Sequence, residues 1–228
     1  MEPVAENIER IKERIQAAAR RSGRQPDGIR LVAVTKTVDV ERIRAAVAHG
    51  VSEIGENYVQ EAAAKLPALA DHPLTRHFIG HLQRNKARHV VEWFDIVQSV
   101  DSLPLAESLS SRCMALGREL EVLVEVNVAG EASKSGVAPE EALALAGQVA
   151  PLPGLKLAGL MGMGPMAGTA DDTRTAFRRL RQLFDQLPSP YRHTLSMGMT
   201  GDFEIALEEG STMIRIGTGI FGQRRTPA

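Results

Sequence analysis

The chain has 228 residues, of which 43% are hydrophobic, with 27 Lys and Arg against 28 Asp and Glu. This length suits one large domain or two small ones, and the near-neutral charge argues against a protein that works by binding nucleic acid or anionic lipid. The single cysteine, Cys113, excludes an intramolecular disulfide and a cysteine-rich metal site, and we expect it to be buried on a helix.

The amino terminus and the hydropathy of the chain predict a cytoplasmic protein. Residues 1–15 are acidic and amphipathic, whereas a signal peptide begins with basic and then apolar residues. No apolar run in the sequence approaches the roughly 20 residues that a membrane span needs.

The predicted elements alternate along the chain. An amphipathic helix comes first, with Val4, Ile8, Ile11 and Ile15 on one stripe and Gly23 at its end. Eight apolar, β-branched segments follow, and each except the last precedes a helix-like segment. They begin at Leu31, Glu53, His77, Asp95, Glu121, Leu155, His193 and Met213. No low-complexity linker divides the chain, so one domain over residues 1–228 is predicted.

Strand–helix alternation with continuously apolar strands predicts a parallel sheet that is covered on both faces. Eight such units indicate an α/β fold, a closed (β/α)8 TIM barrel with an additional N-terminal helix. The rival architecture is an open, doubly wound sheet, which usually has fewer strands and a glycine-rich first turn. No glycine follows the first strand in LVAVTKTVDV, which favours the barrel.

Lys36 ends the first predicted strand, and reactive groups in such barrels gather at the carboxyl ends of the strands. Alternation places Val32, Val34 and Lys36 on one face, so an inward face would carry the amine to the barrel mouth. Partial desolvation there would favour the neutral amine, which is a nucleophile toward aldehydes. The alternative is a lysine that extends from the strand end into solvent.

Two glycine-rich segments, SMGMTGD (196–202) and RIGTG (215–219), follow the seventh and eighth strands. Glycines let backbone N–H groups approach an anion, hydroxyl groups add donors, and these two loops often hold phosphate in such barrels. The alternative is that the glycines only relieve crowding at the rim of the barrel.

Arg215 shares the face of Gly217 and is predicted to point into the barrel. A guanidinium there needs an acceptor, either a pyridine nitrogen of a ligand or a strand-end acid such as Glu56. An aldehyde-binding lysine, a phosphate site and an inward arginine together indicate a site for pyridoxal 5′-phosphate (PLP).

Several long stretches resemble the PLP-binding barrels related to alanine racemase, and most closely the family of single-domain pyridoxal phosphate homeostasis proteins. The resemblance covers about residues 5–224. The matching stretches are AVTKT (33–37), IGENYVQE (54–61), HFIGHLQRNK (77–86), SKSG (133–136), LSMGMTGDFE (195–204) and STMIRIGTGIFG (211–222). One departure is Thr200, where serine is expected, and it retains a hydroxyl group.

The resemblance implies that Lys36 holds PLP as a Schiff base and that Arg215 faces the ring nitrogen. It further implies a set of residues around the phosphate and the pocket wall: Ser196, Gly198, Gly217, Thr218, Asn57 and His81. The implied function is intracellular PLP homeostasis by buffering or delivery, with little or no turnover and no catalytic residue. PLP and apo PLP-dependent enzymes are the implied partners of a monomer that contacts neither nucleic acid nor membrane and holds no metal.

Other interpretations stay open at this point. A PLP-dependent amino-acid racemase or lyase of low activity would use the same lysine. However, an arginine partner leaves the ring a weak electron sink, and neither Tyr58 nor Tyr191 matches a racemase base. A sugar-phosphate barrel with a transient Schiff base would need more strand-end acids than Glu56. His81 could equally be a core histidine, and Lys134 is expected to be an exposed loop lysine.

Overall fold

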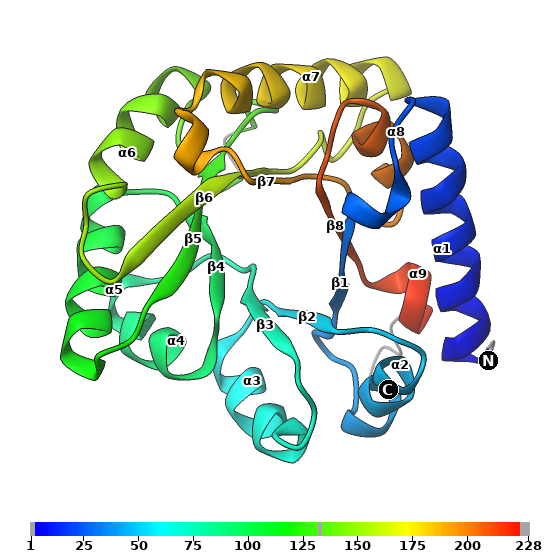
Figure 1. The fold of residues 1–228 in the computed structure, drawn as a ribbon, viewed down its shortest axis with the longest axis horizontal. Helices are drawn as coiled ribbons and strands as arrows, with labels where there is room; N and C mark the ends of the chain where they lie inside the picture. Colours follow the sequence, from blue (N-terminus) through cyan, green and yellow to red (C-terminus); the bar gives the residue numbers. More distant parts are fainter. Residues whose placement is uncertain (1–2, 132–133, 224–228) are drawn as a thin grey trace.

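The computed structural model describes residues 3–131 and 134–223. Within them, eight parallel strands close into a barrel in sequence order, with β8 paired to β1 (Figure 1). The strands are β1 (Arg30–Val34), β2 (Glu53–Glu56), β3 (Thr75–Phe78), β4 (Ile96–Val100), β5 (Leu120–Val126), β6 (Leu155–Gly162), β7 (Thr194–Ser196) and β8 (Met213–Ile216). The predicted TIM barrel is confirmed.

Helices surround the barrel. They are α1 (Val4–Arg21), α2 (Val40–Ala48), α3 (Val59–Lys65), α4 (Ala87–Trp93), α5 (Leu103–Leu116), α6 (Ala142–Val149), α7 (Ala170–Gln186), α8 (Phe203–Glu208) and α9 (Thr218–Phe221). Short 3-10 turns lie between them: η1 (Pro26–Gly28), η2 (Leu66–Leu69), η3 (Arg84–Lys86), η4 (Pro139–Glu141) and η5 (Ser189–Tyr191). The expectation that no helix follows the last strand was wrong. α9 is a single turn that buries Ile220 and Phe221, and it is too short to show helical periodicity in the sequence.

The additional N-terminal helix, α1, closes the side of the barrel where the last and first β/α units meet. It buries Ile8, Ile11 and Ile15, as its apolar stripe predicts, and packs beside α8 and α9 (Figure 1). This packing supports α9 from outside, and α9 carries part of the pocket described below.

Two hydrophobic regions follow from the alternation of side chains along each strand. On β5, Val122 and Val124 face the helices, whereas Leu123 packs inside the barrel with Ala158 and Met161. Cys113 is buried on α5, as predicted. Among the described residues, no helix has the length and apolar character required to cross a membrane.

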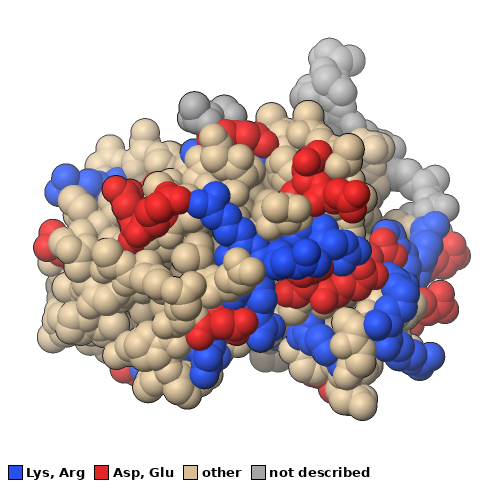
Figure 2. Space-filling model, turned by 90° about the horizontal axis from the view of Figure 1, so that it is seen from above, with Lys and Arg blue, Asp and Glu red and all other residues tan. Residues whose placement is uncertain are grey.

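An ion-pair network ties α8 to its neighbours, and Figure 2 shows a band of basic side chains beside acidic ones on this face. Glu209, just after α8, accepts from Arg174 (2.9 Å) and from Arg178 (3.1 Å) on α7. Glu208 accepts from Arg174 (2.6 Å) and from Arg21 on α1 (2.9 Å). The network therefore joins three helices that are far apart in sequence.

Replacing Glu209 with Gln is expected to lower the free energy of unfolding by about 1 kcal/mol, and by less in 1 M salt, because exposed arginines are screened. Burial alone would raise the pKa of Glu209, but hydrogen bonds from Arg174 and Arg178 outweigh it and the pKa is lowered. The contribution is thus present at neutral pH and is lost as the pH falls through that lowered pKa. Urea unfolding at low and high salt checks this. Glu140→Gln, which removes one exposed pair with Arg179, should change little.

Candidate functional site

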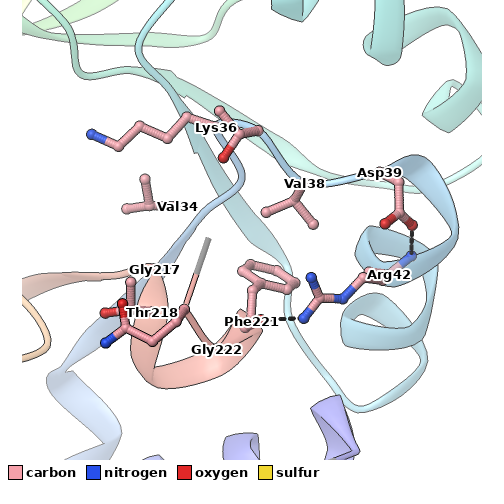
Figure 3. A pocket seen from close by; sticks show the side chains of 11 residues that line it. Val34, Lys36, Val38, Asp39, Arg42, Gly217, Thr218, Phe221 and Gly222 are labelled. Carbon is pink, nitrogen blue, oxygen red and sulfur yellow. Dashed lines mark hydrogen bonds between the residues drawn. The ribbon is translucent and has the colours of Figure 1, made fainter. Parts of the chain in front are cut away.

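Lys36 lies just beyond the end of β1 on the wall of a pocket of about 150 Å³ (Figure 3). Gly217 and Thr218, at the start of α9, line the same pocket, and so does Arg42 from α2. In Figure 3 the Lys36 side chain extends away from Arg42. Because β1 and β8 are adjacent strands, residues from opposite ends of the chain meet here.

The pocket therefore brings together three of the residues that the sequence predicts to share a ligand, at the predicted end of the barrel. Arg42 was not predicted. It donates to the Phe221 carbonyl oxygen, and its guanidinium carbon lies 5.8 Å from the centre of the Phe221 ring. The sequence signal for it is its place on the helix that directly follows the lysine-bearing strand.

Arg215 is buried inside the barrel, in the inward orientation that alternation predicts. Its Nη1 donates to Ser196 Oγ (2.6 Å), and its Nη2 donates to the Gly162 carbonyl oxygen (3.0 Å). Burial lowers the pKa of Arg215 to about 10, although Asp202 and Glu125 oppose the shift, so it stays a cation at neutral pH. Within the described ranges, no carboxylate lies within 4.0 Å of its nitrogen atoms.

The expectation that Glu56 could pair with Arg215 or act at the barrel mouth was wrong. Alternation turns Glu56 away from the interior, and its Oε1 accepts from Lys65 Nζ and the Thr35 hydroxyl, both at 2.6 Å. Burial raises the pKa of Glu56, against the opposing bonds from Lys65 and Thr35. The strand-end acid on β2 thus belongs to the layer between the sheet and the helices.

Ser196 is fully buried and lies beside Arg215 rather than on the wall of the Lys36 pocket. Its hydroxyl group donates to Gln98 Oε1 (2.6 Å) and accepts from Arg215. The chain of hydrogen bonds continues from Gln98 Nε2 to His77 Nδ1 and from His77 Nε2 to Glu53 Oε2, both 2.9 Å. A role for the Ser196 hydroxyl toward phosphate stays a prediction.

The glycines after β7 and β8 differ in what they permit. Gly198 has φ +97°, and a Cβ there would lie 2.6 Å from the Ala206 Cβ, so this glycine allows the loop to pass α8. A Cβ on Gly217 would meet Val34 at an ordinary 3.5 Å, so crowding does not require that glycine. Thr200 Oγ1 accepts from the Gly219 N–H (3.2 Å), which links the two loops through the hydroxyl that replaces serine.

Asn57 and His81 lie together in a second pocket, of about 400 Å³, at the ends of β2 and β3. The His81 side chain is 60% exposed and its Nδ1 lies 3.1 Å from Ser135 Oγ, so it is not a core histidine. Asn57 Oδ1 is buried without a hydrogen-bond partner among the described residues. Tyr58 is exposed, as expected. The structure does not place Asn57 or His81 on the wall of the Lys36 pocket.

Two further residues at this end of the barrel differ from the expectation: Glu125 was not identified from the sequence, and Lys134 was expected to be exposed. Glu125 is buried inside the barrel. Burial and the nearby Asp101 raise its pKa to about 7, with Arg215 opposing. Alternation along LEVLVEV could have identified it, since it shares the inward face of Leu123. Lys134 is not an exposed loop lysine, because its side chain is 12% exposed and its Nζ donates to the Gly164 carbonyl oxygen (2.6 Å). Ser133 of the SKSG stretch lies outside the described residues.

Comparison with known proteins places this barrel in a class. Residues 7–225 match the model of the alanine racemase N-terminal domain. A pyridoxal phosphate homeostasis protein of Pseudomonas aeruginosa is 47% identical over 98% of this chain and 97% of its own length. The chain belongs to the pyridoxal phosphate homeostasis protein family, as its motifs predicted.

Solved structures agree with this assignment. PipY of Synechococcus elongatus, determined without PLP, superimposes with a TM-score of 0.86 at 37% identity, covering 96% of this chain and all of PipY. The structure of PipY with PLP bound gives a TM-score of 0.82 at 36% identity over the same shares of the two chains.

Proposed function

We propose that this protein binds PLP as a Schiff base on Lys36 and serves PLP homeostasis in the cell by holding and releasing the cofactor, as a monomeric single-domain barrel with little or no turnover. The observation that carries the proposal is that Lys36, Gly217 and Thr218 line the same pocket. The PLP-bound structure of PipY supports the choice of ligand.

The residues of the pocket fit the groups of PLP. Arg42 supplies positive charge and Thr218 a hydroxyl group, which suits a phosphate dianion, and Lys36 supplies the amine. When bound, PLP supplies an aldehyde that condenses with an amine and a ring that can withdraw electrons. Arg215 is not among the residues that line this pocket, but it lies on β8 just before Gly217. Its two contacts use two of the five N–H groups of a guanidinium, which can donate to a ring nitrogen but cannot protonate it.

This arrangement favours holding PLP over turning over amino acids. A ring nitrogen that faces Arg215 stays unprotonated, which weakens the withdrawal of electrons that racemases and lyases need. Tyr191 lies in η5, before β7, and thus at the opposite end of the barrel from Lys36. Glu56, the acid expected to serve a sugar-phosphate enzyme, faces the helices. These placements support a carrier.

Lys36→Ala is expected to abolish the Schiff-base absorbance band that forms when PLP is added, because no other amine would occupy that position in the pocket. Borohydride reduction followed by peptide mapping should place the label of the wild-type protein on Lys36. The matched control is Lys156→Ala, which removes an exposed lysine (62% of the side chain) that pairs with Glu119. A label scattered over surface lysines would contradict PLP binding at this site.

Carrier and enzyme differ in two measurable ways. A carrier should transfer PLP to an apo-enzyme faster than the same concentration of free PLP supplies it, and should exchange little solvent deuterium into the α position of amino acids. Clear exchange that Lys36→Ala abolishes would instead establish a racemase or lyase.

A further inference from the structure

Lys36 occupies the corner of a tight turn. The Val38 N–H donates to the Thr35 carbonyl oxygen (3.0 Å), so Lys36 and Thr37 are the two central residues of a β-turn. Thr37 has φ +61°, the only positive φ at a non-glycine position in the part of the chain that the structure describes. Such a turn position is usually glycine, and a β-branched residue is strained there.

A buried charged cluster lies directly against this turn, on the side away from the barrel interior. Lys65, the last residue of α3, has a side chain that is 10% exposed. Its Nζ lies 2.6 Å from Glu56 Oε1 and 2.8 Å from Glu61 Oε1. Two carboxylates thus contact one buried ammonium group, and the Glu56 side chain is 2% exposed.

The cluster bonds to the backbone on both sides of Lys36. Lys65 Nζ donates to the Thr35 carbonyl oxygen (2.7 Å), which is also the acceptor that closes the turn. The Glu61 carboxylate accepts from the Thr37 backbone N–H. The residue before Lys36 is therefore bonded to Lys65 and the residue after it to Glu61, and these two side chains pair with each other.

We propose that Lys65 and Glu61 are positioning residues for Lys36, holding its turn so that its side chain enters the pocket beside Gly217 and Thr218. A strained backbone conformation persists only where surrounding groups maintain it, and the Glu61 contact lies at the strained residue itself. The expected effect of this positioning on PLP affinity rests on the proposed function, in which Lys36 binds PLP.

The test compares Glu61→Ala, Glu61→Gln and the control Glu92→Ala. The control removes an exposed ion pair with Arg112 on α5. Glu92 and Arg112 are distant from the turn in sequence, and within the described part of the chain neither bonds to it. Glu61→Ala removes the acceptor for Thr37 and is expected to raise the dissociation constant for PLP about tenfold, comparable with the loss of a supporting group behind a ligand. Glu61→Gln keeps an oxygen acceptor and should stay within about threefold of the wild type, and Glu92→Ala should be unchanged.

A second readout needs no PLP. Acetylation of Lys36 by acetic anhydride is followed against pH by mass spectrometry, with Lys156 as an internal exposed standard. We expect Glu61→Ala to change the rate of Lys36 acetylation relative to that of Lys156, because the Lys36 side chain would no longer be held toward the pocket. Adding Thr37→Gly should move the rate back, because glycine adopts a positive φ without support. If Glu61→Ala does not fold, Glu61→Gln should show a smaller change in the same direction.

A folded Glu61→Ala variant with a wild-type rate of Lys36 acetylation and wild-type PLP affinity would overturn the positioning role. Wild-type protein that forms no Schiff base on Lys36 would instead refute the proposed function. The acetylation comparison would then still decide whether Glu61 positions Lys36.

Discussion

Glu125→Gln is expected to stabilise the protein at pH 8 by on the order of 3 kcal/mol relative to wild type, and to have little effect at pH 4.5. The pKa of Glu125 is raised from 4.5 to about 7 by burial, with Asp101 adding to the shift. The folded state therefore retains a proton that the unfolded state has lost between these pH values. The contribution of Glu125 to the free energy of unfolding therefore falls as the pH rises from about 4.5, and the loss is complete above about pH 7. Glutamine resembles the neutral acid and does not titrate, so it avoids the loss.

Urea unfolding of the protein without added PLP, at several pH values between 4.5 and 8, measures this effect. Glu119→Gln is the control, because Glu119 is an exposed glutamate (66% of the side chain) paired with Lys156. Curves of stability against pH that run parallel for wild type and Glu125→Gln would show that Glu125 does not titrate in this range.

Gly80→Ala is expected to destabilise the protein by about 3 kcal/mol or to prevent folding. A Cβ at this position would lie 2.2 Å from the Asn57 carbonyl oxygen and 2.8 Å from the Asn57 Cα. These are backbone atoms, so relief requires the ends of β2 and β3 to move apart. The pocket that Asn57 and His81 share would change with them.

The matched control is Gly147→Ala in the interior of α6, where the added Cβ meets no atom within 4 Å apart from its chain neighbours and the backbone of its own helix. This variant should gain about 0.5–1 kcal/mol, because alanine favours the helix. If the close approach at Gly80 decides the outcome, urea unfolding should show a lower free energy of unfolding for Gly80→Ala and a higher one for Gly147→Ala, each relative to wild type. Equal stabilities for Gly80→Ala and wild type would mean that the β2 and β3 ends move apart at no cost.

The barrel was predictable because its signal recurs eight times, so that an error in one strand does not alter the architecture. The inward orientation of Arg215 was predictable for a related reason, since alternation relates it to its neighbours on β8. Lys36 could be identified because its position at a strand end is a local property.

The orientation of Glu56 could not be predicted in the same way. β2 has four residues, of which two are glutamates and one is glycine, so its apolar pattern does not show which face is inward. The burial of Lys65 depends on Thr35, thirty positions earlier in the chain, and the sequence of α3 alone resembles that of an exposed helix. Lys134 is buried for a similar reason, because the loop after β6 covers it.

The chain of hydrogen bonds from Glu53 through His77, Gln98 and Ser196 to Arg215 has a consequence for how this interior can evolve. Each member acts as donor toward one neighbour and acceptor toward the next, or supplies one end of the series. A single replacement therefore removes a hydrogen bond from each neighbour of the replaced residue, and a buried polar atom that is left without a partner costs more than the original bond contributed. Neutral drift inside the barrel should proceed by paired substitutions at adjacent members of the series, and isolated changes there should be rare among functional descendants.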